Sequence, residues 1–325
     1  MKANVYVTRK IPQPGLDLLA NAGLDVEVNP YDKVLSQEEL TKTVRGRDGV
    51  LCLLTDRIDD EIMESAGAGC KGFANYAVGY DNIDIKAATS RKLPISNTPG
   101  VLTDATSDQA WALLFSTARR IVESDRFMRS EKWQGWGPMQ FLGADITGAT
   151  LGIIGAGRIG TSMAMKSVGF NMRVLYYDIQ ANEELEKSTG ARKVDIDTLL
   201  KESDFVSVHI TYTPETTHLL GEREINLMKK SAVLINTSRG PVIDETALVK
   251  ALKEKSIFGA GLDVYENEPK MTEGLKDLSN VVVCPHIASA TTKTRATMAT
   301  MAAENLVAML QGERPPNIVN PEIYK

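Results

Sequence analysis

Short apolar runs alternate with longer amphipathic stretches along almost the whole chain. The apolar runs are rich in Val, Ile and Leu, and runs of this kind predict β-strands. They lie at residues 4–8, 25–28, 49–54, 72–78, 150–155, 173–177, 204–210, 232–236 and 281–284. Helix-like stretches separate most of them. Buried strands that alternate with helices are typical of parallel sheets, so the pattern predicts an α/β fold.

The strands fall into two series, and these predict two domains. One series covers about residues 1–99 and the other about 148–287. A long helix is expected between them, over residues 103–129, directly after the helix-breaking "NTPG". A last helix is expected over residues 291–311, before a glycine and then prolines. The length of 325 residues also favours two cores over one.

Composition excludes several classes of partner. The chain has 43% hydrophobic and 24% charged residues, as ordinary globular proteins do. Its net charge of −5, without any Lys/Arg cluster, argues against a nucleic-acid partner. No apolar run approaches the roughly 20 residues of a membrane-spanning helix. The N-terminal "MKANVYVTRK" predicts a strand and no signal peptide, so we expect a cytoplasmic protein.

The cysteines and histidines do not predict a metal site. Cys52, Cys70 and Cys284 each lie in an apolar, strand-like context. In such a context cysteine usually acts as a small core residue in a reducing compartment. No Cys/His spacing matches a zinc site, and no metal is expected.

The segment "TLGIIGAGRIG", residues 150–160, has the layout of a dinucleotide-binding turn. A strand precedes the glycines and a helix-like segment follows. Gly155 permits a tight turn, Gly157 lets the backbone approach a pyrophosphate, and Gly160 lets helix and strand pack closely. The phosphates would then lie on the open N–H groups of the helix start. The alternative is a tight turn without a ligand. The expected cofactor contacts are Gly155, Ala156, Gly157, Arg158, Ile159 and Gly160.

Asp178 ends the next strand and indicates which dinucleotide binds. Its carboxylate could accept hydrogen bonds from the ribose hydroxyls, and its charge would repel a 2′-phosphate. The next residues, Ile179 and Gln180, supply no cation that could bind such a phosphate. The sequence therefore predicts NAD rather than NADP. The alternative is that Asp178 only caps the helix that follows.

Three polar residues follow apolar segments where strands are expected to end. Ligands of α/β sheets bind beyond the carboxyl ends of the strands. Arg239 follows "AVLINTS", Glu268 follows "GAGLDVYEN" and His286 follows "VVVCP". Each of them alone could have a structural role. Arg239 could form a surface salt bridge, and His286 could be a core or loop histidine. Glu268 could be a solvated loop acid, and Glu266 is as good a candidate.

Together the three residues predict a reaction. A nicotinamide cofactor implies hydride transfer. Reduction of a 2-keto acid needs a cation for the carboxylate and the carbonyl oxygen, and an acid that protonates that oxygen. Histidine suits the acid role because imidazole has an ordinary pKa of about 6.5, and a nearby glutamate favours its charged form. The other two histidines, His209 in an apolar run and His218 in a polar stretch, are poorer candidates.

An ordered set of motifs shows that the sequence resembles the D-isomer-specific 2-hydroxyacid dehydrogenases, over about residues 4–320. The motifs are "NYAVGYDNID" (75–84), "NTPGVLTDAT" (97–106), "GIIGAGRIG" (152–160), "INTSRGPVIDE" (235–245), "GAGLDVYENEP" (259–269) and "CPHIASAT" (284–291). Within the family, "VGYDNID", "NTPGVLTDATSD" and "KWQGWGPMQFLG" are most similar to the glyoxylate/hydroxypyruvate reductases. Ser107 and Gln109 depart from the family, which often has alanine and an aliphatic residue there.

The resemblance implies a role for each candidate. Arg239 would bind the substrate carboxylate and polarise the keto group, and His286 would be the general acid/base. Glu268, directly before Pro269, would pair with His286 in place of Glu266. Further implied cofactor contacts are Thr106, Thr237, Ser238 and Asp263. The implied substrate contacts are Leu54, Thr55, Val78, Gly79, Arg239, His286 and Trp136.

The resemblance also implies an architecture of two Rossmann-like domains with parallel sheets. Residues 1–99 plus 288–325 would form a flavodoxin-like substrate domain, and residues 100–287 an NAD-binding Rossmann domain. The helix after residue 103 and the arm around 130–145 would form a homodimer interface. There Trp136 is similar to a tryptophan that reaches the partner subunit's active site. For the tryptophans of this arm, simple interface or core packing is the alternative.

The sequence therefore predicts an NADH-dependent reductase of a small 2-keto acid, glyoxylate or hydroxypyruvate. D-lactate or another D-2-hydroxyacid dehydrogenase is the nearest alternative. A different class is an NAD(H)-sensing protein of the corepressor type, which binds the nucleotide and docks protein partners. Such proteins typically carry extended tails, and only "PPNIVNPEIYK" follows the last expected helix here.

Overall fold

The computed structural model, which describes residues 2–325, contains two sheets that lie in separate units of the chain. One unit combines the chain up to Leu102 with Ala290–Lys325, and the other is Thr103–Ser289. Every strand pairing in both sheets is parallel. The predicted α/β fold with two parallel sheets is therefore confirmed. Among the described residues, no helix combines the length and apolarity of a bilayer span.

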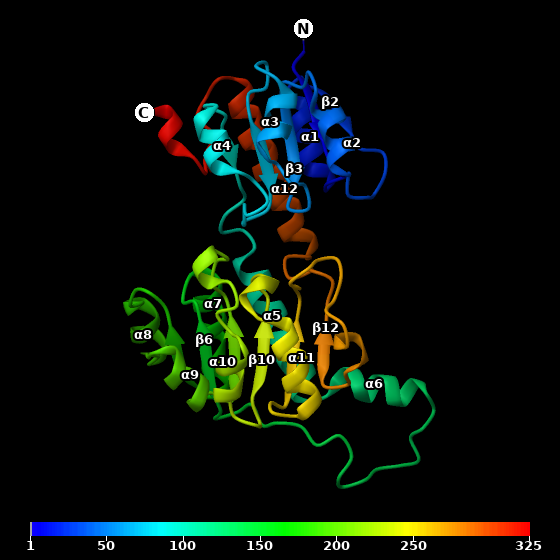
Figure 1. The fold of residues 1–325 in the computed structure, drawn as a ribbon, viewed down its shortest axis with the longest axis vertical. Coiled ribbons are helices and arrows are strands. Elements are labelled where there is room, and N and C mark those ends of the chain that lie inside the picture. The colour runs from blue at the N-terminus through cyan, green and yellow to red at the C-terminus, as the bar shows by residue number, and fades with distance from the viewer. Residues whose placement is uncertain (1) are drawn as a thin grey trace. The chain divides into compact units, whose positions relative to one another are not determined.

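The strands of the first unit, blue to cyan in Figure 1, form a sheet. Its strand order is β2-β1-β3-β4-β5, which is the flavodoxin-like order. Its strands are β1 (Asn4–Val7), β2 (Asp25–Val28), β3 (Gly49–Leu53), β4 (Phe73–Tyr76) and β5 (Ile95–Ser96). One face packs against α1 (Gln13–Asn21) and α12 (Thr292–Leu310). The other face packs against α2 (Gln37–Val44), α3 (Asp60–Ala66) and α4 (Ile85–Ser90). The core side chains of each sheet face therefore come from alternate strand positions.

The sheet of the second unit has the order β12-β11-β10-β9-β6-β7-β8, a Rossmann order with one further strand. Its strands are β6 (Thr150–Ile154), β7 (Arg173–Tyr177), β8 (Arg192–Lys193), β9 (Phe205–Val208), β10 (Val233–Asn236), β11 (Gly259–Leu262) and β12 (Val281–Val283). The helices α5 (Thr103–Ala118), α7 (Arg158–Lys166) and α8 (Glu183–Thr189) cover one face. The helices α9 (Ile196–Glu202), α10 (Glu222–Leu227) and α11 (Glu245–Glu254) cover the other.

The strand-like runs found in the sequence did not include β11, whose "GAGL" lacks the β-branched residues typical of strands, although Glu268 was expected beyond a strand end. The glycines of β11 are explained by the helix that packs on it. A Cβ added to Gly261 would lie 2.9 Å from Leu113 Cβ of α5, and one added to Gly259 would lie 2.9 Å from Thr117 Cγ2. Small residues therefore allow α5 to lie directly on the strand. This close packing depends on tertiary structure, and strand propensity does not report it.

The predicted single helix over residues 103–129 is wrong, because α5 ends at Ala118 and a second helix, α6 (Ile121–Arg129), begins after it. Arg120 between them has a left-handed backbone with φ 53°. The chain returns to this point, where Ala144 N donates to Ala118 O over 2.9 Å. That carbonyl would otherwise accept the next hydrogen bond of a continuing helix. A residue distant in sequence thus ends α5.

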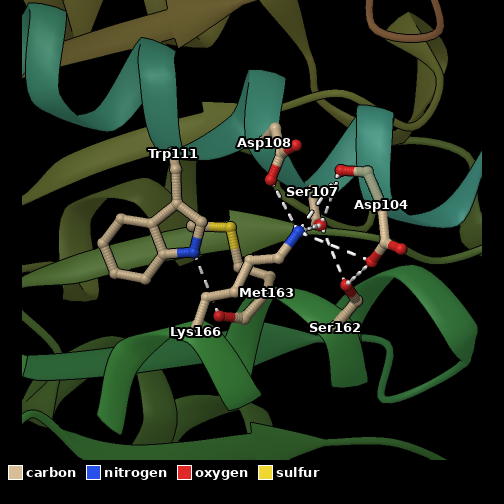
Figure 2. A network of polar contacts seen from close by, with 7 residues as sticks. All are labelled: Asp104, Ser107, Asp108, Trp111, Ser162, Met163 and Lys166. Carbon is tan, nitrogen blue, oxygen red and sulfur yellow. Dashed lines mark hydrogen bonds and ion pairs between the residues drawn. The ribbon is translucent and has the colours of Figure 1, made fainter. Parts of the chain in front are cut away.

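A polar network joins the first turns of α5 to α7 (Figure 2). Lys166 Nζ lies 2.6 Å from Asp108 Oδ1 and 2.6 Å from Ser107 Oγ. Ser162 Oγ donates to Asp104 Oδ1 over 3.0 Å and lies 2.9 Å from Ser107 Oγ. Ser107, one of the departures from the family pattern, therefore has two polar partners on α7, Ser162 and Lys166. The network fixes α5 against the helix that follows the glycine-rich turn.

Candidate active site

The glycine-rich turn joins β6 to α7 at the carboxyl edge of the second sheet. Gly155 has φ 93°, and a Cβ added there would lie 2.8 Å from the His209 carbonyl carbon. A Cβ on Gly160 would lie 1.9 Å from Gly155 O, so helix and strand approach closely. A Cβ on Gly157 would have no neighbour within 4 Å. The backbone of Gly157, at the N-terminus of α7, is therefore accessible, as the approach of a pyrophosphate requires.

Two side chains that follow β7 in the chain form hydrogen bonds with the turn. Asp178 Oδ2 accepts a hydrogen bond from Ala156 N over 2.7 Å. Asn182 Nδ2 donates to Ala156 O over 2.8 Å and lies 2.9 Å from Thr161 Oγ1. The carboxylate of Asp178 thus lies beside the turn, where a bound adenosine ribose is expected. Sequence reasoning missed Asn182, because nothing in its local sequence shows which backbone atoms it contacts.

A buried hydroxyl at the exit of β10 lacks a protein partner. Thr237 is 7% exposed, and its Oγ1 has no hydrogen-bond partner among residues 2–325. The neighbouring Ser238 hydroxyl donates to Asn236 Oδ1 over 2.9 Å. Buried polar groups rarely remain unpaired, so the Thr237 hydroxyl fits a contact to a bound ligand. Together with the open glycine turn, the residues present fit a dinucleotide. Thr106, also expected near the cofactor, is buried in α5.

Arg239 follows β10, and its loop abuts the loop that follows β11. Asn236 Nδ2 donates to Arg239 O over 3.0 Å, and Arg239 Nη1 donates to Ser238 O over 2.8 Å. A Cβ added to Gly240 would lie 1.8 Å from the Tyr265 carbonyl carbon. The two loop backbones are therefore in direct contact at Gly240, where only glycine fits.

His286 and Glu268 form a hydrogen-bonded pair. His286 Nδ1 lies 2.9 Å from Glu268 Oε2, and Tyr265 N donates to Glu268 Oε1 over 3.1 Å. Partial burial alone would raise the pKa of Glu268. The pKa is nevertheless lowered, because the carboxylate is stabilised by the hydrogen bond and charge of His286, by the hydrogen bond from Tyr265 N–H and by the charge of Arg239. Glu268 therefore favours its ionised form. A proton on Nδ1 is held by this carboxylate, which leaves Nε2 for proton exchange.

Asp263 holds the segment that carries His286. Its carboxylate is fully buried and accepts hydrogen bonds from Ile287 N over 2.8 Å and Ala288 N over 2.7 Å. His286 N donates to Asp263 O over 2.9 Å. These bonds fix His286, which has a left-handed backbone with φ 54°. The strand before His286, β12, was expected to be buried, but it is an edge strand and Val283 is 37% exposed.

The other two histidines have environments that do not suit a general acid. Burial lowers the pKa of His209 to about 3. Its imidazole is therefore neutral near pH 7, and Nε2 lies 2.8 Å from Ser207 Oγ. His218 Nε2 lies 2.7 Å from Glu266 Oε1. Glu266 is thus the partner of His218, and Glu268 is the partner of His286.

The substrate contacts predicted in the first unit lie at the carboxyl edge of its sheet. Leu54 and Thr55 follow β3, and Val78 and Gly79 follow β4. Asn75 Nδ2 donates to Gly79 O over 2.9 Å. A second amide, of Asn97, donates to Val78 O. Their backbone is thus held in one conformation, and their contact with a substrate stays a prediction.

The arm after α6 exposes large apolar side chains. Trp136 is 84% exposed, Met139 77% and Trp133 51%. Core packing is therefore wrong as an explanation for either tryptophan.

In the second unit, Arg239, Glu268 and His286 follow the adjacent strands β10, β11 and β12, and the dinucleotide-type turn follows β6 at the same edge of the sheet. This set can bind a carboxylate, donate a proton to a carbonyl and bind a hydride-carrying nucleotide.

Comparison with known proteins gives consistent matches over the chain. Residues 111–288 match the family model described as "D-isomer specific 2-hydroxyacid dehydrogenase, NAD binding domain". A glyoxylate reductase of Thermococcus litoralis is 50% identical, over 99% of this chain and 98% of the relative. A glyoxylate reductase of Korarchaeum cryptofilum is 49% identical, over 100% and 98%. A crystal structure of a Thermus thermophilus protein, 44% identical, superposes with a TM-score of 0.91 over 97% of this chain and 99% of that one.

Proposed function

The chain belongs to the D-isomer specific 2-hydroxyacid dehydrogenase family and is an NAD-dependent oxidoreductase, and from this premise we propose that it reduces glyoxylate with NADH. Relatives about half identical over their full length carry the name glyoxylate reductase. The observation in this chain that carries the proposal is the His286–Glu268 pair at 2.9 Å, beside the loop of Arg239. Hydroxypyruvate is the second candidate substrate, because of the motifs that resemble glyoxylate/hydroxypyruvate reductases.

The proposed mechanism assigns one task to each of these residues. NADH, when bound, supplies the hydride to the keto carbon. The Arg239 guanidinium binds the substrate carboxylate and stabilises negative charge on the keto oxygen. His286 Nε2 donates a proton to that oxygen, which completes the hydroxyl of the 2-hydroxy acid. Glu268 holds the proton on Nδ1 and stabilises the charged imidazole before the transfer.

The proposal is tested by NADH oxidation with glyoxylate, hydroxypyruvate, pyruvate and 2-ketogluconate, repeated with NADPH. We expect rapid oxidation of NADH with glyoxylate or hydroxypyruvate. Turnover of pyruvate alone would keep the mechanism and assign a D-lactate dehydrogenase. If NADH binds but no keto acid is reduced, the reductase assignment is wrong, and an NAD(H)-sensing role becomes the better hypothesis.

The Asp178→Ala variant should narrow the preference for NADH over NADPH. The carboxylate beside the glycine turn repels a 2′-phosphate and accepts hydrogen bonds from the ribose, and alanine does neither. The measurement is the ratio of kcat/KM with the two cofactors. Glu184→Ala, which removes an exposed carboxylate of α8, is the matched control and should keep the wild-type ratio. An unchanged ratio in Asp178→Ala would refute the assigned ribose contact.

The Glu268→Gln variant should move the loss of reductase activity at high pH to lower pH. Reduction needs the protonated imidazole of His286, so the rate falls as that proton is lost with rising pH. Ionised Glu268 stabilises the protonated form, in keeping with its own lowered pKa, and glutamine does not. The measurement is kcat/KM for glyoxylate against pH. Glu273→Gln, an exposed carboxyl nearby, is the control. A superimposable profile would exclude Glu268 from this role.

We further propose a homodimer in the cytoplasm. The arm after α6 exposes Trp133, Trp136 and Met139, and a concentration of large apolar side chains is typical of protein interfaces. The residues that would cover them belong to a second copy of the chain. Light scattering measures the mass of the particle in solution, and the mass of a single chain would contradict the dimer.

A further inference from the structure

A buried carboxylate links the loop of Arg239 to the loop of Glu268. Glu245, the first residue of α11, follows the Arg239 loop and is only 2% exposed. Its Oε1 accepts a hydrogen bond from Glu266 N over 2.9 Å, and its Oε2 accepts one from the Thr272 hydroxyl over 2.6 Å. Both acceptors of Glu245 are therefore bonded to the chain that follows β11.

The side chain of Glu266 in turn bonds the backbone of Glu245. Its Oε2 accepts a hydrogen bond from Glu245 N over 3.3 Å, so each glutamate accepts from the backbone of the other. Its Oε1 lies 2.7 Å from His218 Nε2, and His218 N in turn donates to Pro241 O over 2.8 Å. Three chain segments are thus joined, and their polar bonds surround the close backbone contact at Gly240.

The clamp formed by Glu245, Glu266 and His218 continues into the candidate catalytic pair. Glu266 directly follows Tyr265, whose N–H donates to Glu268 Oε1. The other oxygen of Glu268 bonds His286. A shift of the loop at Glu266 therefore moves the donor that orients Glu268. The same shift changes the separation of that loop from Arg239, because Gly240 and Tyr265 are in contact.

Helix capping does not explain the buried carboxylate. The N-terminus of α11 is already capped by Asp244, whose Oδ1 accepts from Ala247 N over 3.0 Å. Burial of an ion is costly unless it is fully hydrogen-bonded, and an apolar residue of similar size often stabilises a fold as well. What Glu245 adds is a defined geometry, since both oxygens bond fixed groups of another loop.

We propose that Glu245 is a positioning residue, which through Glu266 and His218 sets the distance between Arg239 and the Glu268–His286 pair. The inference rests on the proposed reduction of a 2-keto acid, in which Arg239 and the Glu268–His286 pair must contact the same substrate molecule. Small displacements of reacting groups lower rates strongly, because they remove the aligned geometry on which the rate depends. Glu245 itself touches neither substrate nor cofactor in this role.

The test compares Glu245→Ala with the conservative Glu245→Gln. Glutamine can still accept from Glu266 N and donate to the Thr272 hydroxyl, and alanine can do neither. We expect kcat for glyoxylate to fall by about 10-fold or more in Glu245→Ala, and its pH profile to move toward that of Glu268→Gln. Glu245→Gln should recover most of kcat. Affinity for NADH should stay near wild type, because the clamp does not include the glycine turn.

Glu254→Ala, at the exposed other end of α11, is the matched control and should leave kcat and the pH profile unchanged. A purely structural role would lower Tm and the yield of folded protein, with wild-type kcat per NADH-binding site and a wild-type pH profile. That result in Glu245→Ala would overturn the proposal. If Glu245→Ala does not fold, two other variants each remove one of these bonds: Thr272→Val removes the bond to Glu245, and His218→Leu removes the bond to Glu266. Wild-type kcat and pH profiles in both would equally overturn it.

The wild-type enzyme is assayed in the same experiment, so that two failures can be told apart. A wild type without activity on any keto acid contradicts the proposed function alone. The clamp is then tested by NMR at one pH, through the chemical shifts of the three imidazoles, one for each histidine of the chain. The His286 chemical shifts should change in Glu245→Ala and return in Glu245→Gln. Unchanged His286 chemical shifts in Glu245→Ala would refute the positioning role directly.

Discussion

Replacing His286 with alanine is expected to lower kcat for glyoxylate reduction by about 100-fold or more. The hydride that reaches the keto carbon leaves negative charge on the oxygen, and that charge must be neutralised by a proton. His286 is the candidate donor, because Glu268 holds its Nδ1 and Asp263 holds its backbone. Neutral His209 cannot take over, since burial lowers its pKa to about 3.

The control for His286→Ala is the affinity for NADH, measured by nucleotide fluorescence. The glycine turn and Asp178 do not include the imidazole, so we expect NADH to bind nearly as tightly as in wild type. Added imidazole should restore part of the rate, because its protonated form can enter the space left by the side chain and donate the proton. A kcat within a few-fold of wild type would show that the proton comes from another group or from water.

The local chemistry of the nucleotide turn could be predicted from sequence because it is local in the chain. The tight turn at Gly155, the accessible backbone at Gly157 and the close approach at Gly160 follow from a short segment between a strand and a helix. The strand exits that carry Arg239, Glu268 and His286 were also predictable, since apolar runs mark strands and ligands bind beyond their carboxyl ends. Each inference needed only a local pattern and one general rule.

Features that depend on distant contacts could not be predicted in this way. The helix α5 ends where Ala144 N donates a hydrogen bond to the carbonyl of Ala118. The strand β11 can consist of "GAGL" because α5 lies directly on its glycines. Helix and strand patterns describe a segment and its neighbours, whereas these two features are imposed by other elements.

The choice between two glutamates shows the same limit within the site. Glu266 and Glu268 are two residues apart and looked alike as candidate partners of His286. In the structure their side chains have different partners, since Glu266 bonds His218 and Glu268 bonds His286. Spacing alone cannot separate these roles. The family resemblance favoured Glu268 through the proline that follows it, and the clamp role of Glu266 emerged only from the fold.

Replacing Arg239 with alanine should lower kcat/KM for glyoxylate by about 100- to 1,000-fold, with both a higher KM and a lower kcat. In the proposed mechanism, the guanidinium binds the substrate carboxylate before the reaction and stabilises the negative charge on the keto oxygen during it. Removal of one group that serves both states therefore affects both constants. Arg239→Lys keeps the charge but not the planar pair of donors, so it should recover only part of the loss.

Arg192→Ala, which removes an exposed arginine at the edge strand β8, is the matched control for Arg239→Ala and should leave both constants unchanged. Affinity for NADH separates loss of the substrate contact from damage to the nucleotide site, and we expect it to change little. A rise in KM with unchanged kcat would mean that Arg239 binds glyoxylate without stabilising the developing charge. In that case another hydrogen-bond donor must stabilise the charge on the keto oxygen, and the proposed mechanism would have to assign this role to a group other than Arg239.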